Sequence, residues 1–233
     1  MERALMEGGR PALSVSDAVD RRAAVRAFLD RPVERATVED ILRRAARAPS
    51  SGNLQPWVVR LVDGPEIAAL KALMRDTLKE IPDGEPGAPD FYPDPMKPAY
   101  LARRRRNGEI LYGALGIDRN DAVARKAWID QNFQFFGAPT GVLLFMERRS
   151  TPYQWLDIGI YLQTVLLLLR EAGLDSCPQA DWALFEATVK QALDAPPDLA
   201  LVCGIAIGYA DPAHPENVAR TERDDPLASY SIR

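Results

Sequence analysis

The segment that most constrains the fold is residues 158–169, an apolar run with only two polar interruptions. It is too short for a bilayer span, which takes about 20 apolar residues. Just upstream, Thr151, Pro152 and Gln154 form a strong helix start, with a cap, a proline in the first turn and a capping-box partner. Gly173 supplies the stop. The pattern predicts one long helix that is apolar nearly all round and therefore central in the fold.

A second apolar segment, residues 199–209, has the length and composition of a central β-strand. Shorter strands are predicted at residues 57–62 and 141–146. Apolar residues at helical spacing predict several further helices. These cover residues 16 or 17 to 28, 37–48, 66–80, 99–112, 121–136 and 181–193. Helices come first and strands then mix with helices, which predicts an α+β fold.

The length of 233 residues lies within the range of one large domain. We expect residues 1–16 to form a leader and residues 17–233 a single domain. Residues 82–98 hold six prolines and predict a long irregular loop, a feature that is often functional. Together with the helical segment 99–136, this loop is expected to cover part of the functional site.

Charge and cysteine content narrow the class of protein. A net charge of −4 argues against a general nucleic-acid binder, which usually needs a basic face. The first ten residues contain no apolar core of signal-peptide length, and no membrane span is predicted. The two cysteines, Cys177 and Cys203, form no CxxC motif, which fits a reducing compartment and a cytoplasmic location.

His214 is the only histidine, which rules out a multi-histidine metal site within one chain. No metal is predicted. The sequence also lacks the GxSxG, GxxxxGK[ST] and GxGxxG motifs. If the chain performs redox chemistry, its cofactor is therefore not held by a Rossmann phosphate loop.

The polar run at residues 49–57 is a candidate binding segment. It places two hydroxyls, a glycine and two amides between a predicted helix end and a strand. Such groups can hydrogen-bond a flat ring with polar edges, such as the flavin pyrimidine. By composition alone, the same residues also fit a plain polar turn.

Three further segments are candidates. Arg22 and Arg26 lie four apart, on one face of the predicted first helix, where two guanidiniums can bind a phosphate. Arg220 and Arg223 could supply further phosphate ligands. The backbone of residues 173–179 could approach a flat ring. The alternatives for these three segments are, in order, a solvated basic face, a charged tail and an ordinary connection between helices.

Together these segments resemble the nitroreductase family of FMN flavoproteins. Residues 45–57 contain the pattern A-x-x-A-P-S-S-x-N-x-Q-P-W in full. Three more segments resemble, in order, R-x-S-x-R-x-F, G-L-x-[ST]-C-P-Q and N-x-x-R-x-x-R, at residues 22–28, 173–179 and 217–223. The middle of the chain resembles the nitrobenzoate-reductase-like branch, at residues 103–108, 111–112, 132–133 and 136–139.

The resemblance implies a mixed sheet flanked by helices, in an intertwined homodimer with two FMN sites at the interface. It implies that Arg22, Arg223 and Arg220 hold the phosphate, and that Arg26 stabilises the reduced flavin electrostatically. The run at 49–57 would often act from the other subunit. The implied FMN contacts are Arg22, Ala23, Ala24, Arg26, Pro49, Ser50, Ser51, Asn53, Gln55, Pro178, Gln179, Ala180, Arg220 and Arg223. Ala24 replaces the serine of the family pattern, so only backbone contacts are expected there.

The implied activity is a two-electron, ping-pong reduction of nitroaromatic or quinone substrates on FMN, with NADH or NADPH as donor. The chemistry belongs to the cofactor, and no catalytic acid or base is required of the protein. Other FMN reactions remain open, namely reductive dehalogenation, enone reduction and flavin fragmentation. A flavin-binding protein without turnover and a structural dimer without cofactor are the non-enzymatic alternatives.

Overall fold

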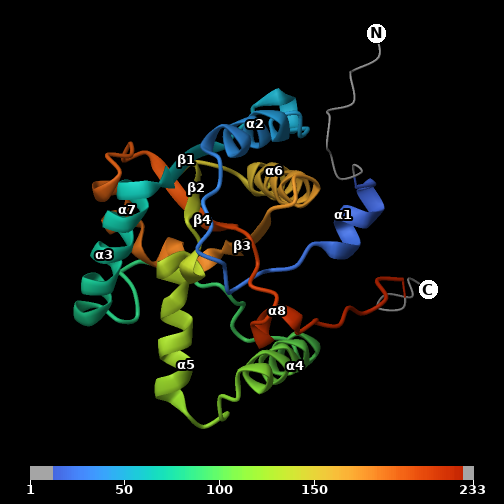
Figure 1. Cartoon of the computed structure of the whole chain (residues 1–233). Coiled ribbons are helices and arrows are strands. Elements are labelled where there is room, and N and C mark those ends of the chain that lie inside the picture. Colours follow the sequence, from blue (N-terminus) through green and yellow to red (C-terminus); the bar gives the residue numbers. More distant parts are fainter. Residues whose placement is uncertain (1–12, 228–233) are drawn as a thin grey trace.

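The computed structural model describes residues 13–227. Residues 1–12, most of the leader predicted over residues 1–16, lie outside this range. The strands are β1 (Val58–Asp63), β2 (Thr140–Glu147), β3 (Asp175–Gln179) and β4 (Leu199–Gly208). The α-helices are α1 (Val15–Arg21), α2 (Arg35–Ala45), α3 (Gly64–Glu80), α4 (Pro98–Leu115), α5 (Ala122–Ile129), α6 (Pro152–Glu171), α7 (Glu186–Ala192) and α8 (Pro215–Val218). Residues 13–227 also contain three 3-10 helices, η1 (Ser51–Asn53), η2 (Asp130–Gly137) and η3 (Ala180–Phe185). Figure 1 shows their arrangement.

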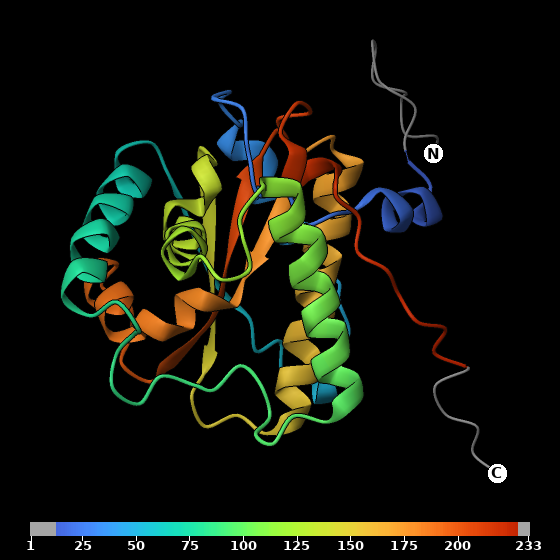
Figure 2. The same cartoon turned by 90° about the horizontal axis from the view of Figure 1, so that it is seen from below.

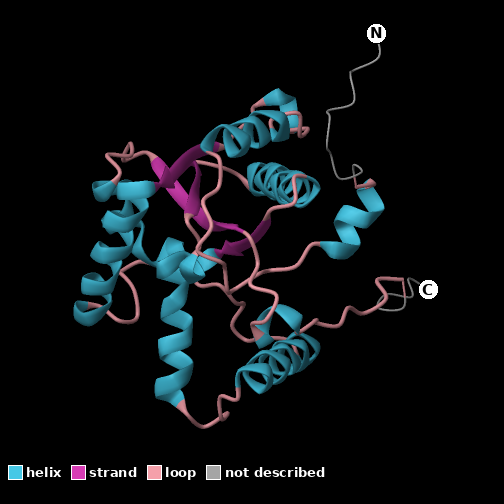
Figure 3. Cartoon of the chain, viewed as in Figure 1, coloured by secondary structure: helices cyan, strands magenta, loops and turns pink. Residues whose placement is uncertain are grey.

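The four strands form one sheet in the order β1-β2-β4-β3, and each neighbouring pair is antiparallel. A parallel contact is added at the outer edge, where Ala24 bridges to Ser176 of β3. β4 lies inside the sheet, as its apolar sequence predicts. Helices cover both faces of the sheet (Figure 3), so the predicted α+β class is confirmed.

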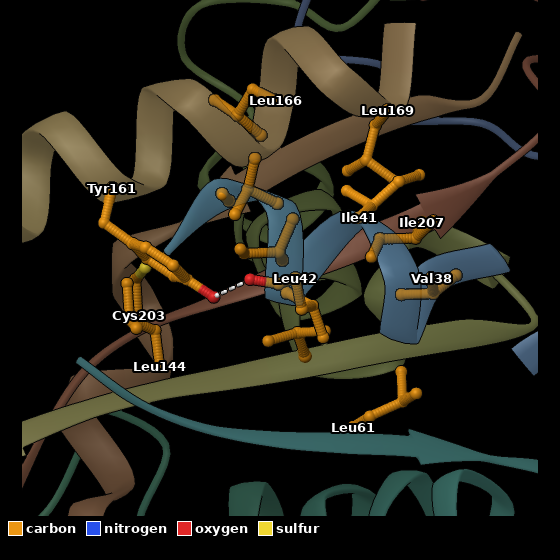
Figure 4. Close-up of a cluster of buried hydrophobic side chains, with 14 of the residues drawn as sticks. Val38, Ile41, Leu42, Leu61, Leu144, Tyr161, Leu166, Leu169, Cys203 and Ile207 are labelled. Atoms are coloured by element: carbon orange, nitrogen blue, oxygen red, sulfur yellow. Dashed lines mark hydrogen bonds between the residues drawn. The ribbon is translucent and has the colours of Figure 1, made fainter. Parts of the chain in front are cut away.

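One face of the sheet is covered by α2 and α6. Figure 4 shows side chains of both helices packed over β2 and β4. Tyr161 lies deep in this cluster, and its hydroxyl donates to the carbonyl of Leu42 in α2. The predicted capping box of Thr151 and Gln154 is present at the start of α6. Residues such as Ile158, Val165 and Leu169 bury one side of α6 on the sheet, whereas its first turns stay largely exposed. The helix is therefore buried on one side, and not all round as its apolar run predicts.

The opposite face is covered by α3, α7 and the two 3-10 helices η2 and η3. Trp182 of η3 lies flat enough against β4 that a Cβ on Gly204 would come within 2.2 Å of its ring. Only glycine permits this approach. The two clusters together bury both sides of the central strands, and the sheet therefore presents only its ends and edges for binding.

Two predicted elements differ from the structure near the N-terminus and after α6. The first helix ends at Arg21 instead of continuing towards Phe28. Residues beyond it are extended because the amide of Val25 donates to the carbonyl of Ser176, so pairing with β3 replaces helical bonding. Residues 175–179, expected as a connection, form β3. A short polar segment with a proline does not predict a strand, but Pro178 is tolerated because β3 lies at the edge of the sheet.

Two predicted helices are interrupted. The segment 121–136 is α-helical only to Ile129 and continues as η2. The segment 181–193 begins as η3, and α7 starts at Glu186. Residues 82–97 are irregular, as their prolines predict. Within residues 13–227, no helix has the length and apolarity that crossing a membrane requires.

Candidate cofactor-binding site

The extended segment after α1 places its arginines on one side. Arg22 and Arg26 were predicted to share a helix face, but this part of the chain is not helical. Side chains alternate in extended backbone, so residues two and four apart point the same way. Arg22, Ala24 and Arg26 therefore face a common side. The predicted helix is wrong at these residues, but the two arginines still lie on the same side of the chain.

The C-terminal segment is tied to this strand-like stretch by Asn217 of α8. Its side-chain oxygen accepts from the amide of Arg26 at 3.0 Å. Its side-chain nitrogen donates to the carbonyls of Ala27 at 2.8 Å and Asp211 at 2.9 Å. One amide side chain thus uses both of its functional ends to join residues almost 200 positions apart.

A cavity of about 240 Å³ lies between these two segments and α4. It brings together six of the residues predicted to contact FMN: Arg22, Ala23, Ala24, Arg26, Arg220 and Arg223. Six more lining residues come from α4 and the C-terminal segment: Asn107, Ile110, Leu111, Glu216, Ala219 and Thr221. None of these six is among the residues predicted to contact FMN. Figure 2 shows α4 beside the C-terminal segment, which explains their shared location.

The cavity has an excess of unpaired positive charge. Within residues 13–227, neither the side chain of Arg22 nor that of Arg220 makes a hydrogen bond or an ion pair. Arg223 donates to the Thr221 hydroxyl and to two backbone carbonyls, with no carboxylate among these acceptors. Guanidiniums match the oxygens of a phosphate group in forked geometry. The donor set therefore fits a phosphate-bearing cofactor.

One carboxyl group faces the same cavity. The side chain of Glu216 is only 2% exposed, and its Oε1 lies 3.8 Å from Nε of Arg26. Its Oε2 accepts from the indole nitrogen of Trp128 at 3.0 Å. Burial raises the pKa of Glu216 above the ordinary value for a glutamate, against the lowering effects of Trp128 and Arg26.

The polar run at residues 49–57 lies elsewhere. Its serines, Asn53 and Gln55 form or flank η1, and none of them lines the cavity. The amide of Ser51 donates to both carboxylate oxygens of Asp157 in α6, at 3.2 and 3.1 Å. At the end of the run, the Trp57 ring stacks on Tyr161 with centroids 4.8 Å apart. The run is therefore fixed to α6 while its middle stays exposed.

The end of β3 and the start of η3 are also outside the cavity lining. Gln179 is buried, and its side-chain nitrogen donates to the carbonyl of Asn132 at 2.7 Å. Its side-chain oxygen accepts from the indole of Trp182 at 3.4 Å. The amide thus stabilises the packing of η2 and η3 on the sheet. The predicted cofactor contacts of Pro178, Gln179 and Ala180 stay predictions.

The four consecutive arginines of α4 are all exposed. Arg103 pairs with Asp224 and Arg106 with Glu222, so two of them hold the C-terminal segment against α4. Arg104 lies over the ring of Tyr92 in the proline-rich loop, 4.1 Å from its centroid. The same helix therefore contacts both the loop and the segment that carries Arg220 and Arg223.

The fold is a sheet with helices on both faces. An arginine-lined cavity, suited to a phosphate-bearing cofactor, lies between the extended N-terminal segment and the C-terminal segment. The model of the Nitroreductase family matches residues 19–209. The chain belongs to this family, which confirms the resemblance inferred from the four motifs and the class of enzyme that it implies.

Several members are similar over nearly their whole length. A 4-nitrobenzoate reductase of Pseudomonas putida is 37% identical, over 88% of this chain and 89% of that protein. A 4-nitrobenzoate reductase of Nocardioides sp. (strain LMS-CY) is 38% identical, over 92% and 88%. The crystal structure of the FMN and NADPH-dependent nitroreductase NfnB from Sphigopyxis sp. strain HMH has a TM-score of 0.88 and 42% identity, with 93% of this chain and 97% of that chain covered.

Proposed function

We propose that this chain is an FMN-dependent oxidoreductase that takes electrons from NADH or NADPH and reduces nitroaromatic compounds and quinones. The observation that carries the proposal is the cavity lined by four arginines, of which three (Arg22, Arg220 and Arg223) have no carboxylate partner among residues 13–227. Support comes from the FMN and NADPH dependence stated for the similar NfnB structure. A second NfnB structure, from Mycobacterium smegmatis, was solved with NADPH and has a TM-score of 0.85 at 30% identity.

In this proposal Arg22, Arg220 and Arg223 bind the FMN phosphate. Ala23 and Ala24 contact the cofactor through their backbone, since neither side chain offers a polar group. Arg26 provides positive charge that would stabilise the negative charge of the reduced ring, because opposite charges attract strongly in a shielded site. Bound FMN would supply the redox chemistry, accepting a hydride and returning two electrons to the second substrate.

The protein's own part is to bind, orient and shield. Nicotinamide and nitro compound would use the same cavity in turn, which predicts ping-pong kinetics. No proton-transferring side chain is required of the chain in this scheme. The proline-rich loop 82–98 and the segment 99–136 would cover the cavity and shape its specificity, in keeping with the contact between Arg104 and Tyr92.

We further propose a homodimer in which the run at residues 49–57 completes the site of the partner subunit. Large apolar side chains are exposed around this run: Leu54 is 64% exposed, Trp155 50% and Leu156 61%. Exposed apolar groups gathered in one region mark association surfaces. α1, which presents Val15 and Val19, lies beside the same helix α6.

The substrate class rests on the relatives. Two of them are named 4-nitrobenzoate reductases, and a third, 34% identical, is a nitrobenzene nitroreductase of Ectopseudomonas oleovorans. The shared chemistry is an aromatic nitro group. Dependence on nicotinamide nucleotides favours the cytoplasm, where these donors are supplied.

The test is anaerobic turnover of the purified protein with 4-nitrobenzoate and either NADH or NADPH. We expect a yellow protein whose flavin is bleached by the donor, and nitroso, hydroxylamine or amine products after the nitro compound is added. A matched sample of Arg22→Ala, refilled with excess FMN, should regain less bound flavin.

Other outcomes would favour the alternatives. A colourless protein that takes up no added FMN would end the flavin proposal. FMN that is bound but not reduced by either nucleotide would indicate a binding protein without turnover. Flavin reoxidation by a halogenated or enone substrate, with no reduction of the nitro compound, would indicate a different FMN reaction.

A further inference from the structure

Arg26 is the arginine of the cavity that has an acidic neighbour. Its Nε lies 3.8 Å from Oε1 of Glu216, and this oxygen accepts no hydrogen bond within the described residues. The other carboxylate oxygen is held by Trp128, whose ring also lies 5.8 Å from the guanidinium carbon of Arg26. The three side chains thus form one compact group, with Arg26 and Glu216 both lining the cavity.

Burial removes Glu216 from solvent and shields Arg26 in part. The Glu216 side chain is 2% exposed and that of Arg26 28%. A charge held in such a shielded place acts on its neighbours with little screening by water. The ionisation of Glu216 therefore decides whether the cavity presents a positive or a nearly neutral group beside the bound molecule.

Other charged or titratable groups face this pair. Asp181 of η3 interacts with Arg26, and burial raises the pKa of its carboxyl as well. The thiol of Cys177 in β3 interacts with both Arg26 and Glu216, and burial raises its pKa to about 11, so it stays neutral near physiological pH. His214 lies near Glu216 and favours the ionised carboxylate when it is itself charged.

We propose that Glu216 is a positioning residue that partly neutralises Arg26, and that it thereby sets the reduction potential of the cofactor bound in this cavity. The inference rests on the proposed function, because it needs FMN in the cavity. With Glu216 ionised, Arg26 offers less net positive charge to the reduced ring. With Glu216 protonated, the full charge of Arg26 favours reduced over oxidised flavin.

The expected direction is fixed by this charge. Glu216→Gln keeps the size of the side chain and an oxygen for the Trp128 indole, but it removes the negative charge. We expect reduced FMN to gain about tenfold in binding over oxidised FMN, which is about 30 mV upward for a two-electron couple. The difference from the unaltered protein should shrink as pH falls through the raised pKa of Glu216.

The experiment is spectroelectrochemical titration of the FMN-loaded protein at alkaline and at mildly acidic pH, with the Kd of oxidised FMN measured in parallel. Glu80→Gln is the matched control, since Glu80 is an exposed glutamate at the end of α3, which does not line the cavity. It should leave the potential unchanged. Trp128→Phe is a second variant, which removes the indole donor and should shift the potential in the same direction but less.

The outcomes separate the two proposals. An unaltered protein that binds no FMN overturns the proposed function and this inference together. Full FMN loading with equal potentials for Glu216→Gln, Trp128→Phe and the unaltered protein overturns the inference alone. Weaker binding of both flavin forms with an unchanged potential would also overturn it, because that result indicates only a structural role for Glu216.

Discussion

Two regions that the sequence points to for the same cofactor differ in how complete they are within one chain. The arginines of residues 22–26 and 220–223 come from opposite ends of the sequence, and they meet around one cavity. The run at residues 49–57 is the longest motif, but it lies exposed and lines no part of that cavity. The most specific motif thus identifies the family, but it does not show which residues form one site within a chain.

The difference indicates what each region needs. Asn217 ties the C-terminal segment to the N-terminal one through two hydrogen bonds, to the amide of Arg26 and the carbonyl of Ala27, and a third bond holds it to Asp211. The run is joined to α6 through Asp157, and apolar side chains surround it. A polar turn that is rigidly fixed at an exposed apolar surface fits a contribution to a second copy's cavity. This comparison can be tested by damaging each region separately and then together.

The largest effect is expected from removing two unpaired arginines. A charge-assisted hydrogen bond contributes about 1.5–3 kcal/mol. Arg22→Ala combined with Arg220→Ala should therefore weaken FMN binding about a thousandfold, measured by calorimetric titration of the cofactor-free protein. The matched control is Arg43→Ala with Arg44→Ala, which removes two exposed arginines of α2. Equal affinity in both double variants would contradict a phosphate site in the cavity.

The assignment of the run to the partner subunit is tested by mixing variants. Asn53→Leu should lower FMN retention in the homodimer, and Arg22→Ala should do so independently. In a mixed dimer of these two chains, a site built across the interface receives either both defects or neither. About half of the FMN content of the unaltered dimer should then return. If arginines and run belonged to the same site within one chain, the mixed dimer would recover nothing.

A smaller effect is expected at the anchor of the run. Asp157→Ala removes the acceptor of the Ser51 amide, which costs about 1 kcal/mol in the positioning of this turn. FMN affinity should fall roughly fivefold to tenfold in the dimer. Asp157→Asn keeps an acceptor oxygen and should lower the FMN affinity less. Unchanged FMN affinity in both variants would show that the orientation of the run does not matter for binding.

Much of the fold could be predicted because local signals were strong. The capping box at Thr151 and Gln154 and the apolar run behind it define α6. β4 is long and apolar enough to be a central strand. β3 was missed because residues 175–179 carry a proline and polar side chains, and its strand form depends on pairing with β4. The end of α1 at Arg21 likewise depends on the partner that Val25 finds in Ser176.

The site was predicted unevenly for the same reason. Arginine spacing indicated phosphate binding whether the segment is helical or extended, since residues four apart share a side in both forms. Glu216 lies in no motif, and the family-like segment at residues 103–108 does not mark Asn107 as a cavity residue. Their role depends on the approach of α8 and α4 to the N-terminal segment, which no sequence spacing encodes.

The smallest effect concerns the support beneath the run, where Trp57 stacks on Tyr161. Tyr161→Phe keeps the stack but loses the hydrogen bond to the Leu42 carbonyl, so unfolding free energy at neutral pH should fall by about 1 kcal/mol. Burial raises the pKa of Tyr161 from 10.0 to about 12. The unaltered protein should therefore lose stability as pH rises from about 10 to about 12, because the unfolded tyrosine ionises first. The phenylalanine variant lacks this loss, so urea unfolding curves of the two proteins should converge near pH 11. If the two unfolding free energies differ as much at pH 11 as at neutral pH, this hydroxyl is not buried.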